Sequence, residues 1–275
     1  MKVKFYGTRG SIPICDKEFQ QFGGNTTCIQ IETSNKDVLG IFDAGTGIRK
    51  LGIDIYKDRE EIPKDFFVVF SHFHWDHIQG FPFFNPAYDK DVRITFVAMG
   101  KQHQITDLRE VLALQMQNLY FPVQLDNMGA KFHFLLPDKM TSYFNLTKLT
   151  CVKQNHPGGS YGYRMEREGK VLVICTDLEH ANDVIDQDVV ELARGADLLI
   201  HEAQYTSEEL EKYRGWGHSS YEQALKVAEM AGVKRLVMTH HDPNHDDDFL
   251  LKMEKKCQDR FKDSFLAREN MEFIL

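Results

Sequence analysis

The sequence predicts an α/β (α+β) fold in one domain that spans residues 1–275. Apolar runs of strand length alternate with segments of helical periodicity along the whole chain, which is typical of mixed layers of helices and strands. Neither an internal repeat nor a low-complexity linker interrupts this alternation. A chain of 275 residues is long enough to bury a sizeable core, and 42% hydrophobic with 27% charged residues is ordinary for a globular protein.

Apolar or alternating runs predict the strands, and turn-forming residues separate them. Gly7-Thr-Arg-Gly10 ends the first run, Gly23-Gly24-Asn25 precedes the second, and the third ends at Asp43-Ala-Gly-Thr-Gly47. The strands expected in the first half of the chain are 3–6, 27–32, 38–42, 66–70, 91–97 and 131–136. The strands expected in the second half are 146–152, 161–167, 170–175, 196–200 and 233–239, with two short strands at the C-terminus.

Segments with apolar residues at helical spacing predict the helices. In the segment 48–56 the apolar face carries Ile48, Leu51 and Ile55. The other expected helices are 102–119, 186–194, 221–231 and 246–261. A serine directly before residue 221 is a suitable N-terminal cap.

Charge and cysteine content indicate which partners and which cellular compartment to expect. The net charge is −8 and no run of lysine and arginine occurs, so extended nucleic acid is a disfavoured partner. Five widely spaced cysteines without a Cys-x-x-Cys pair predict no disulfide framework and suit a reducing cytosol. We find no segment typical of a signal peptide and no apolar run long enough to span a membrane, so we expect a cytoplasmic protein.

The stretch Ser71-His72-Phe73-His74-Trp75-Asp76-His77 is the strongest functional signal. It follows the apolar run 66–70, so a buried strand would hold it in place. Imidazole nitrogens and a carboxylate oxygen at this spacing can reach one point or two adjacent points. Such mixed ligands suit zinc, and less specifically manganese or iron. The alternative is a solvated, histidine-rich turn that binds no metal.

Other polar side chains also come directly after apolar strands. Besides the histidine-rich stretch, these are Asp43, Asp177, Glu202 and His240, and His156 follows the strand 146–152 after three residues. Strand ends along one edge of a sheet can converge on one cleft. We therefore expect these residues to share a site.

Several residues have two interpretations. The aromatic segment 81–88 is expected to pack in the core, or else to form a wall that stacks on a flat substrate ring. Arg9 could meet a substrate anion, although an exposed surface arginine is the favoured interpretation. His133 is expected to be a packed or sheet-edge residue. His240 is preferred to His241 as a ligand, and we expect His245 to be exposed to solvent.

The pattern His-x-His-x-Asp-His over 72–77 resembles the signature of the metallo-β-lactamase superfamily of metal-dependent hydrolases. His201-Glu202-Ala-Gln and Gly217-His218-Ser-Ser resemble paired motifs of its ribonuclease Z-like phosphodiesterase branch. The order of motifs along the chain is similar to bacterial members of that branch. The resemblance implies a four-layer αββα sandwich, in which helices flank two mixed β-sheets.

The resemblance also implies a set of metal ligands. Two divalent metal ions are implied, with Zn²⁺ as the first expectation and Mn²⁺ or Fe²⁺ as alternatives. By this similarity Asp177 would bridge the two metals, and Asp43 would orient the histidine-rich loop. The ligands implied for the first metal are His72, His74 and His156, and those for the second are Asp76, His77 and His240.

For the reaction, the resemblance implies attack on phosphorus by a metal-bridged hydroxide. His218 is expected to protonate the leaving oxygen as general acid, with Glu202 as its carboxylate partner, because an alkoxide is a poor leaving group. Asp76 is expected to orient or deprotonate the attacking water as well as to bind metal. Glu202 as a core carboxylate and His218 as a residue at a helix N-terminus are the alternatives.

One departure from the ribonuclease Z pattern bears on the substrate. Those enzymes carry a long basic arm between the two residues that correspond to His156 and Asp177, which here are only twenty residues apart. We therefore expect a small phosphodiester, such as a cyclic nucleotide or a cyclic sugar phosphate. A ribonuclease Z-like RNA endonuclease, a lactone, thioester or β-lactam hydrolase, and a metal-holding binding protein are the alternatives. A homodimer is left open.

Overall fold

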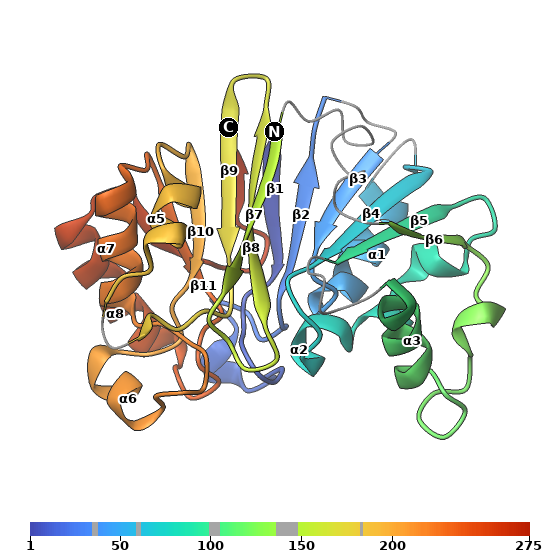
Figure 1. Cartoon of the computed structure of the whole chain (residues 1–275). Helices are drawn as coiled ribbons and strands as arrows, with labels where there is room; N and C mark the ends of the chain where they lie inside the picture. Colours follow the sequence, from blue (N-terminus) through green and yellow to red (C-terminus); the bar gives the residue numbers. More distant parts are fainter. Residues whose placement is uncertain (35–37, 59–61, 99–104, 136–147, 182–183) are drawn as a thin grey trace.

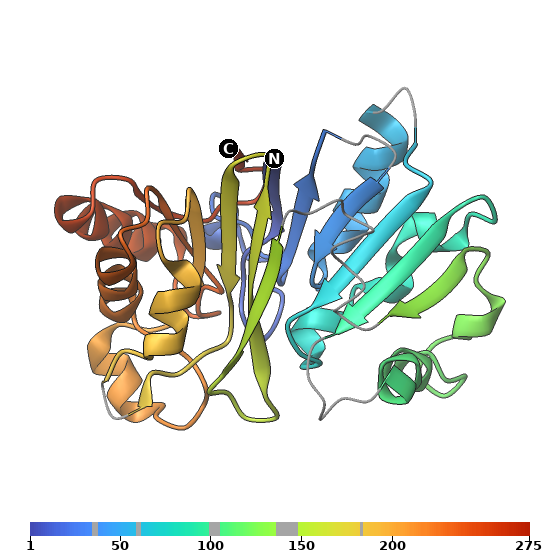
Figure 2. The ribbon, with the colours of Figure 1, turned by 45° about the horizontal axis from the view of Figure 1, so that its top comes forward.

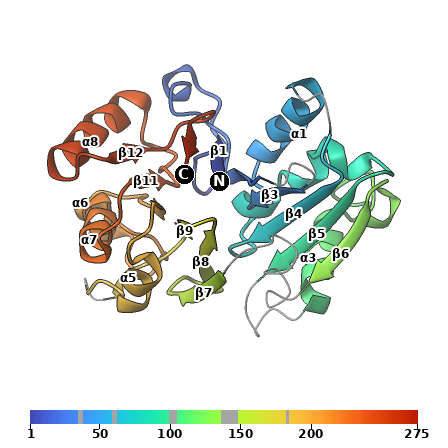
Figure 3. The ribbon, with the colours of Figure 1, turned by 90° about the horizontal axis from the view of Figure 1, so that it is seen from above.

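The computed structural model describes residues 1–34, 38–58, 62–98, 105–135, 148–181 and 184–275. Two β-sheets lie face to face in the middle of the molecule, and helices cover the outer side of each (Figure 1). Seen from above, the helices again lie on the two outer sides with both sheets between them (Figure 3). This is the αββα sandwich that the resemblance implied.

The first sheet has seven strands in the order β13-β1-β2-β3-β4-β5-β6. Pairing is antiparallel from β13 to β3 and parallel from β3 to β6, so the sheet is mixed. The strands are β1 (Lys2–Gly7), β2 (Cys28–Glu32), β3 (Val38–Phe42), β4 (Asp65–Phe70), β5 (Arg93–Ala98), β6 (Lys131–Leu135) and β13 (Glu272–Ile274).

The second sheet has six strands in the order β12-β11-β10-β9-β8-β7. It is parallel from β12 to β9 and antiparallel from β9 to β7. The strands are β7 (Lys148–Gln154), β8 (Ser160–Arg167), β9 (Lys170–Cys175), β10 (Leu198–Glu202), β11 (Leu236–Thr239) and β12 (Ser264–Leu266).

The helices form the two outer layers. Those on the side of the first sheet are α1 (Gly47–Asp58), α2 (Trp75–Ile78) and α3 (Ile105–Gln115), and those on the side of the second are α5 (Gln187–Ala193), α6 (Ser207–Lys212), α7 (Tyr221–Ala231) and α8 (Asp247–Arg260). Figure 2 keeps α5 to α8, in orange to red, on one side of the sheets. Short 3₁₀ turns are η1 (Lys17–Phe19), η2 (Phe81–Phe83), η3 (Asn85–Tyr88) and η4 (Leu125–Asn127).

Side chains on successive strand residues point to opposite faces, and this alternation builds three apolar layers. On β4, Phe66, Val68 and Phe70 pack against the helices, whereas Phe67 and Val69 pack into the space between the two sheets. A continuous run of apolar residues on β4 is therefore buried on both faces, as its hydrophobic sequence indicates. The strand holds the following histidine-rich loop from a rigid position.

Most predicted elements are confirmed, with shifts of a few residues at their ends. The strands 38–42 and 170–175 and the helix 221–231 match their predicted bounds. The serine cap is also confirmed, because Ser220 and Gln223 form a reciprocal capping box. The helix predicted over 102–119 covers only Ile105–Gln115 among the described residues.

The strand expected over 196–200, with His201-Glu202 at its end, is β10, which includes both of these residues. Helix α6 was not predicted, although Thr206 and Glu209 form a capping box at its start and the spacing Thr-x-x-Glu could have revealed it. Of the remaining expectations, all five cysteines are free, and none of the described helices is long and apolar enough to cross a membrane.

The two sheets are tied together at the end of β4 by hydrogen bonds from β8. The buried Tyr163 hydroxyl donates to the Phe70 carbonyl oxygen at 2.7 Å, and the Tyr161 backbone N–H donates to the Ser71 carbonyl oxygen at 3.2 Å. Both acceptors lie at the start of the histidine-rich loop. The second sheet therefore positions a loop that the first sheet carries.

Replacing Tyr163 with Phe should lower the free energy of unfolding by about 1–3 kcal/mol, because the variant removes the hydroxyl donor from a buried carbonyl. Urea denaturation of Tyr163→Phe measures this. Tyr120→Phe, at an exposed tyrosine, is the matched control. An equal change in both variants would contradict a role for the inter-sheet hydrogen bond.

Candidate metal centre

The polar residues that follow the strands meet at one end of the sandwich, where the short helix α2 lies at the foot of the two sheets in Figure 1. Asp43, Asp177 and His240 come just after β3, β9 and β11, and each has a positive φ, of 59°, 57° and 63°. Left-handed backbone is uncommon for residues other than glycine and occurs often at functional sites. Here it turns the chain sharply after a strand.

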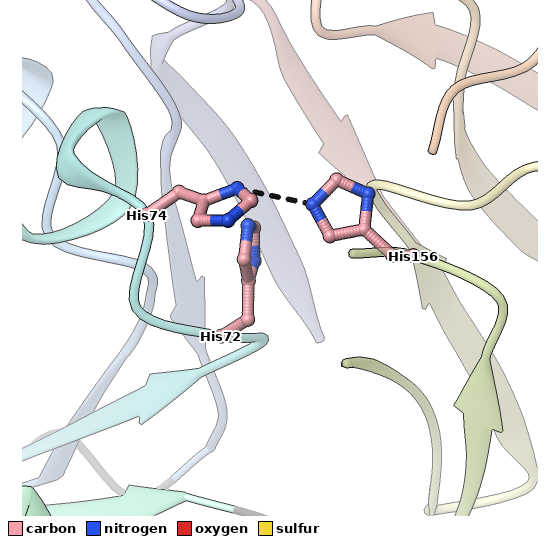
Figure 4. Close-up of side chains that lie close together, drawn as sticks. All are labelled: His72, His74 and His156. Carbon is pink, nitrogen blue, oxygen red and sulfur yellow. Dashed lines mark hydrogen bonds between the residues drawn. The ribbon is translucent and has the colours of Figure 1, made fainter. Parts of the chain in front are cut away.

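Three histidines form the first group of ligand atoms. His72 and His74 come from the loop after β4, and His156 comes from the turn between β7 and β8. Figure 4 shows the three rings pointing toward one another. The His156 Nε2 lies 3.0 Å from the His74 Nδ1, and His74 is the exposed member of the group.

Asp76, His77 and His240 form the second group, which is buried. The Asp76 Oδ2 lies 3.2 Å from the His77 Nε2 and 3.1 Å from the His240 Nε2. It also accepts a hydrogen bond of 2.8 Å from the Ser11 backbone N–H. Helix α2 carries Asp76 and His77, so one helical turn presents two of these three ligands.

Asp177 lies between the two groups. Its carboxylate oxygens are 3.8 Å from the His72 Nε2, 3.3 Å from the His77 Nε2 and 3.3 Å from the His240 Nε2. It therefore lies beside candidate ligands of both groups. The structure brings together all seven residues that were expected to bind metal.

In four of these histidines the ring nitrogen that points away from the cluster contacts an oxygen. The His72 Nδ1 lies 3.0 Å from the Ser71 Oγ, and the His77 Nδ1 lies 2.8 Å from the Asp43 Oδ2. The other two contacts are His156 Nδ1 with the Gly217 carbonyl oxygen at 2.9 Å and His240 Nδ1 with the Gln204 Oε1 at 3.0 Å. Such partners fix the ring orientation and direct the other nitrogen to a metal.

Asp43 supports the loop as well as a ring. Its carboxylate accepts hydrogen bonds of 2.8 Å from both the backbone N–H and the hydroxyl of Ser71, in addition to contacting His77. Asp43 is fully buried, and among the described residues Ser71 and His77 supply the contacts that satisfy its carboxylate. The prediction that Asp43 braces the histidine-rich loop is confirmed.

The donor set fits a divalent metal. The Nε2 atom of His72 is buried and has no hydrogen-bond partner among the described residues. A buried polar atom without a partner costs free energy, and a metal ion would remove that cost. Imidazole nitrogens with carboxylate oxygens are ligands that zinc accepts.

The carboxylates control the protonation of two of the histidines. Burial lowers the pKa of His77, but the carboxylates of Asp177, Asp76 and Asp43 outweigh it and raise that pKa well above its usual value. Burial likewise lowers the pKa of His240, and Asp177 and Asp76 outweigh it, so the net shift is upward. The carboxylates therefore favour the protonated form of both rings.

His218 lies beside the cluster, and its pairing with Glu202 is looser than expected. Its buried Nδ1 is 3.7 Å from the Glu202 Oε1 and 3.9 Å from the Asp177 Oδ1, and it has no hydrogen-bond partner among the described residues. The Glu202 carboxylate instead accepts backbone N–H bonds from Leu178, Gln204 and Ser219.

The pKa of His218 is also lower than the expected role as a proton donor requires. Burial, together with His240, lowers the pKa of His218 to about 4, so the ring is neutral at neutral pH. Burial raises the pKa of the Glu202 carboxyl well above its usual value. The expectation that a carboxylate keeps His218 protonated therefore does not describe the metal-free protein.

Two expectations about buried residues were wrong. His245 is buried, because it stacks on Phe249 and contacts the Glu209 carboxylate at 2.9 Å. Arg9 is fully buried and donates to the carbonyl oxygens of residues 23, 242 and 245 at 2.8, 3.1 and 2.7 Å. Arg9 thus ties the N-terminal loop to the segment after His240, and it is neither exposed nor placed to meet a substrate.

The surroundings of His241, His133 and the segment 81–88 decide between the interpretations given to them above. The buried His241 contacts the Ala267 carbonyl oxygen through its Nε2 at 2.9 Å and lies outside the groups of ligand atoms. His133 is exposed on β6, the edge strand of the first sheet. In the segment 81–88, Phe81 and Phe84 are buried in the core beside the helices, which confirms core packing for those two rings.

Sequence reasoning did not identify several residues that shape the site. Gln204 orients His240, and the Gly217 carbonyl oxygen orients His156. Gly10 is required by a close approach, because a Cβ there would lie 2.4 Å from the His240 Nδ1. Gly217 has a φ of +90°, and its Cβ would lie 2.1 Å from the His156 Nδ1. Gln204 and Gly217 belong to the motifs His201-Glu202-Ala-Gln and Gly217-His218-Ser-Ser, and Gly10 ends the turn 7–10, but none of the three was assigned a contact.

Comparison with known proteins supports this fold. Residues 41–241 match the family described as "Beta-lactamase superfamily domain". The chain is 26% identical to a ribonuclease Z of Picrophilus torridus, over 99% of this chain and 95% of that protein. This similarity does not confirm the expectation that extended nucleic acid is a disfavoured partner.

Solved structures share the fold along the whole chain. A diphosphatase from the PhnP family has a TM-score of 0.69 at 17% identity, over 100% of this chain and 97% of that one. The short form of human tRNase Z has a TM-score of 0.65 at 20% identity, over 100% of this chain and 99% of that one. Identities this low establish a shared fold and nothing further about activity.

Replacing Asp43 with Asn should weaken zinc binding roughly 10- to 100-fold, because the neutral amide no longer orients the His77 ring as the carboxylate does. Competition with a chromophoric chelator measures the affinity. Asp54→Asn, which removes a carboxylate paired with Lys50 on α1, is the control and should bind zinc as the parent does. Equal affinities in both variants would contradict the support assigned to Asp43.

Metal binding should release protons, and the affinity should rise with pH above about 6.5, because neutral imidazole is the form that binds metal. His77 and His240 have raised pKa values and must lose their protons first. Calorimetric titration of zinc into metal-free protein, in buffers with different ionisation enthalpies, counts the protons released. An affinity independent of pH would contradict this assignment.

Proposed function

The chain belongs to the beta-lactamase superfamily, in its ribonuclease Z-like branch, and on that basis we propose that it is a binuclear metal-dependent phosphodiesterase of small phosphodiesters. The substrates that we propose are cyclic nucleotides or cyclic sugar phosphates. The observation that supports this most is His218, a buried imidazole whose unpaired Nδ1 lies within 3.9 Å of Asp177. A side chain that can carry a proton beside the ligands suits a reaction with a poor leaving group.

The proposed ligands divide into two groups joined by Asp177. His72, His74 and His156 would hold one ion, and Asp76, His77 and His240 the other. We propose zinc at both positions, since nitrogen and carboxylate donors suit it. Two divalent ions held here would draw negative charge from the phosphoryl oxygens and lower the pKa of water.

We assign to Asp76 the orientation of the attacking water. Burial raises the pKa of Asp76, but the charge of His77 and the hydrogen bond to His240 outweigh it and hold that pKa well below its usual value. A carboxylate with so low a pKa stays ionised and is a weak base. Asp76 therefore acts in this proposal by holding the water in position and not by removing its proton.

His218 is assigned the role of general acid, and the substrate itself supplies the charge that this role needs. The pKa of His218 is about 4 in the metal-free protein, so the ring has to gain affinity for a proton. An anionic phosphodiester nearby raises the pKa of a histidine, since opposite charge favours the protonated form. Glu202 is assigned a positioning role, because it accepts the N–H of Ser219, the residue after His218.

RNA hydrolysis is the second candidate. The similarity to a ribonuclease Z over nearly the whole chain favours it. Against it, the twenty residues between His156 and Asp177 are largely the β8–β9 hairpin, from Ser160–Arg167 to Lys170–Cys175, which leaves little chain there for an arm that grips RNA. A substrate screen that contains both cyclic nucleotides and oligoribonucleotides separates the two candidates.

Metal-loaded protein should hydrolyse bis(p-nitrophenyl) phosphate, lose this activity with chelator and regain it with zinc or manganese. The same preparation should be screened against 2′,3′- and 3′,5′-cyclic nucleotides, oligoribonucleotides, lactones and thioesters. Turnover of an acyl substrate without turnover of any phosphodiester would overturn the proposal. Retention of metal without turnover of any ester would instead indicate a binding protein.

His218→Ala should lower kcat on an alkyl phosphodiester about 10²- to 10⁴-fold, because general acid catalysis typically contributes that much. A p-nitrophenyl ester should be affected far less, since its leaving group departs without a proton. His133→Ala, on the distant edge strand β6, is the matched control. Equal losses on both esters would contradict the general-acid role and leave His218 as a structural residue.

A further inference from the structure

We propose that the two tryptophans of the chain, Trp75 and Trp216, form an aromatic subsite beside the metal centre that stacks on the nucleobase of a nucleoside phosphodiester. The inference rests on the proposed phosphodiesterase function and narrows its substrate class. It favours nucleoside phosphodiesters over sugar phosphates that lack a base.

Both indole side chains are unusually exposed. Trp75 is 81% exposed and Trp216 is 61% exposed, whereas tryptophan is highly buried on average in folded proteins. Single exposed apolar residues need no explanation. Here, however, both tryptophans of the chain lie in the loops that carry proposed site residues. Trp75 separates His74 from Asp76, and Trp216 lies two residues before His218.

A continuous series of contacts joins the two loops. His74 lies next to Trp75, and its Nδ1 is 3.0 Å from the His156 Nε2 (Figure 4). The His156 Nδ1 is in turn 2.9 Å from the carbonyl oxygen of Gly217, the neighbour of Trp216. The backbones that carry the two indoles therefore lie on either side of one histidine pair.

The turn that carries Trp216 is held in place. Gly215 and Gly217, on either side of Trp216, have positive φ values of 85° and 90°. Their backbone N–H groups both donate to the Glu179 carboxylate, at 2.8 and 2.9 Å for its Oε2. The Tyr213 ring packs edge-on against the Trp216 ring, with 5.2 Å between centroids. Trp216 is thus displayed on an organised turn.

Trp75 is fixed by the helix that it begins. It is the first residue of α2, and its carbonyl oxygen accepts the Gln79 N–H at 2.8 Å. Asp76 and His77 on the same turn are buried, so the indole occupies the solvent side of the ligand-bearing helix. Ile12, 55% exposed, adds apolar surface on the Asp76 side, because its neighbour Ser11 donates to the Asp76 carboxylate.

A nucleobase is the group that this surface suits. A phosphodiester held at the ligand cluster by its phosphoryl oxygens would have its ester groups directed away from the cluster, and the exposed indoles lie in segments next to that cluster. An indole presents a flat apolar face, and a base stacks on such a face whatever its hydrogen-bonding edge. The segment 81–88 cannot take this role through Phe81 and Phe84, which are buried. We therefore expect the protein to prefer substrates that carry a nucleobase over substrates that lack one, and to discriminate little among the four bases.

Intrinsic fluorescence tests the subsite directly, because Trp75→Phe and Trp216→Phe each leave one indole as the reporter. Adenosine and uridine 5′-monophosphates should quench zinc-loaded protein in both variants, and ribose 5-phosphate at the same concentration should not. Absence of quenching by either nucleotide would overturn the subsite. So would equal quenching by ribose 5-phosphate, since that would report the phosphate alone.

Kinetics supply the second readout. The ratio of kcat/KM for adenosine 2′,3′-cyclic phosphate to that for the base-free ribose 2′,3′-cyclic phosphate should fall roughly 5- to 100-fold in Trp75→Ala and in Trp216→Ala. Tyr120→Ala, which removes another exposed aromatic ring, should keep the parent ratio. A short oligoribonucleotide tested alongside shows whether the base comes from RNA or from a cyclic nucleotide.

The outcomes separate this inference from the proposed function. Turnover of phosphodiesters with no preference for a base, together with no quenching, overturns the subsite and leaves the phosphodiesterase standing. Quenching by nucleotides without turnover of any phosphodiester would support the aromatic subsite and overturn the proposed phosphodiesterase function. Light scattering of the parent protein and of the Trp75→Ala/Trp216→Ala double variant tests a different occupant. A dimer that dissociates in the double variant, without quenching in the parent protein, would show that the two indoles contact a second copy of the chain and would overturn the subsite.

Discussion

The close approach of carboxylates and imidazoles at the foot of the two sheets is the constraint on which the site depends. Asp43, Asp76 and Asp177 are buried within a few ångströms of His77, and buried charges are tolerated only when they are paired. The carboxylates raise the pKa of both His77 and His240, so they favour protonated rings that supply the opposite charge. The same geometry accepts divalent ions, which would supply that charge in place of the protons.

The fold creates this concentration of charge by ending several strands at one place. Residues just after β3, β9 and β11 adopt left-handed backbone, which redirects the chain into the cluster at once. Tertiary contacts then stabilise the strained loops. Hydrogen bonds from β8 hold the end of β4, and the buried Arg9 guanidinium holds the segment after His240.

The ligand cluster, the residues beside it and the surrounding loops each determine a different aspect of the reaction. The ligand cluster accounts for metal-dependent hydrolysis and is compatible with several substrate classes. In the proposed reaction His218 protonates the leaving group and Glu202 positions it, and in the proposed subsite Trp75 and Trp216 contact the nucleobase. Specificity therefore lies in loop residues around a centre whose chemistry the fold family shares.

The sequence alone determined the fold class, most strands and helices, and the candidate ligands, because these depend on local periodicity and on residue type. His72, His74, Asp76 and His77 are close in sequence, so their convergence could be inferred from their spacing. The tertiary structure decided which groups surround them. Arg9 hydrogen-bonds to residues more than 230 positions away, and His245 contacts the Glu209 carboxylate, 36 positions earlier in the sequence. Such contacts depend on how the two sheets pack, and no local pattern encodes that packing.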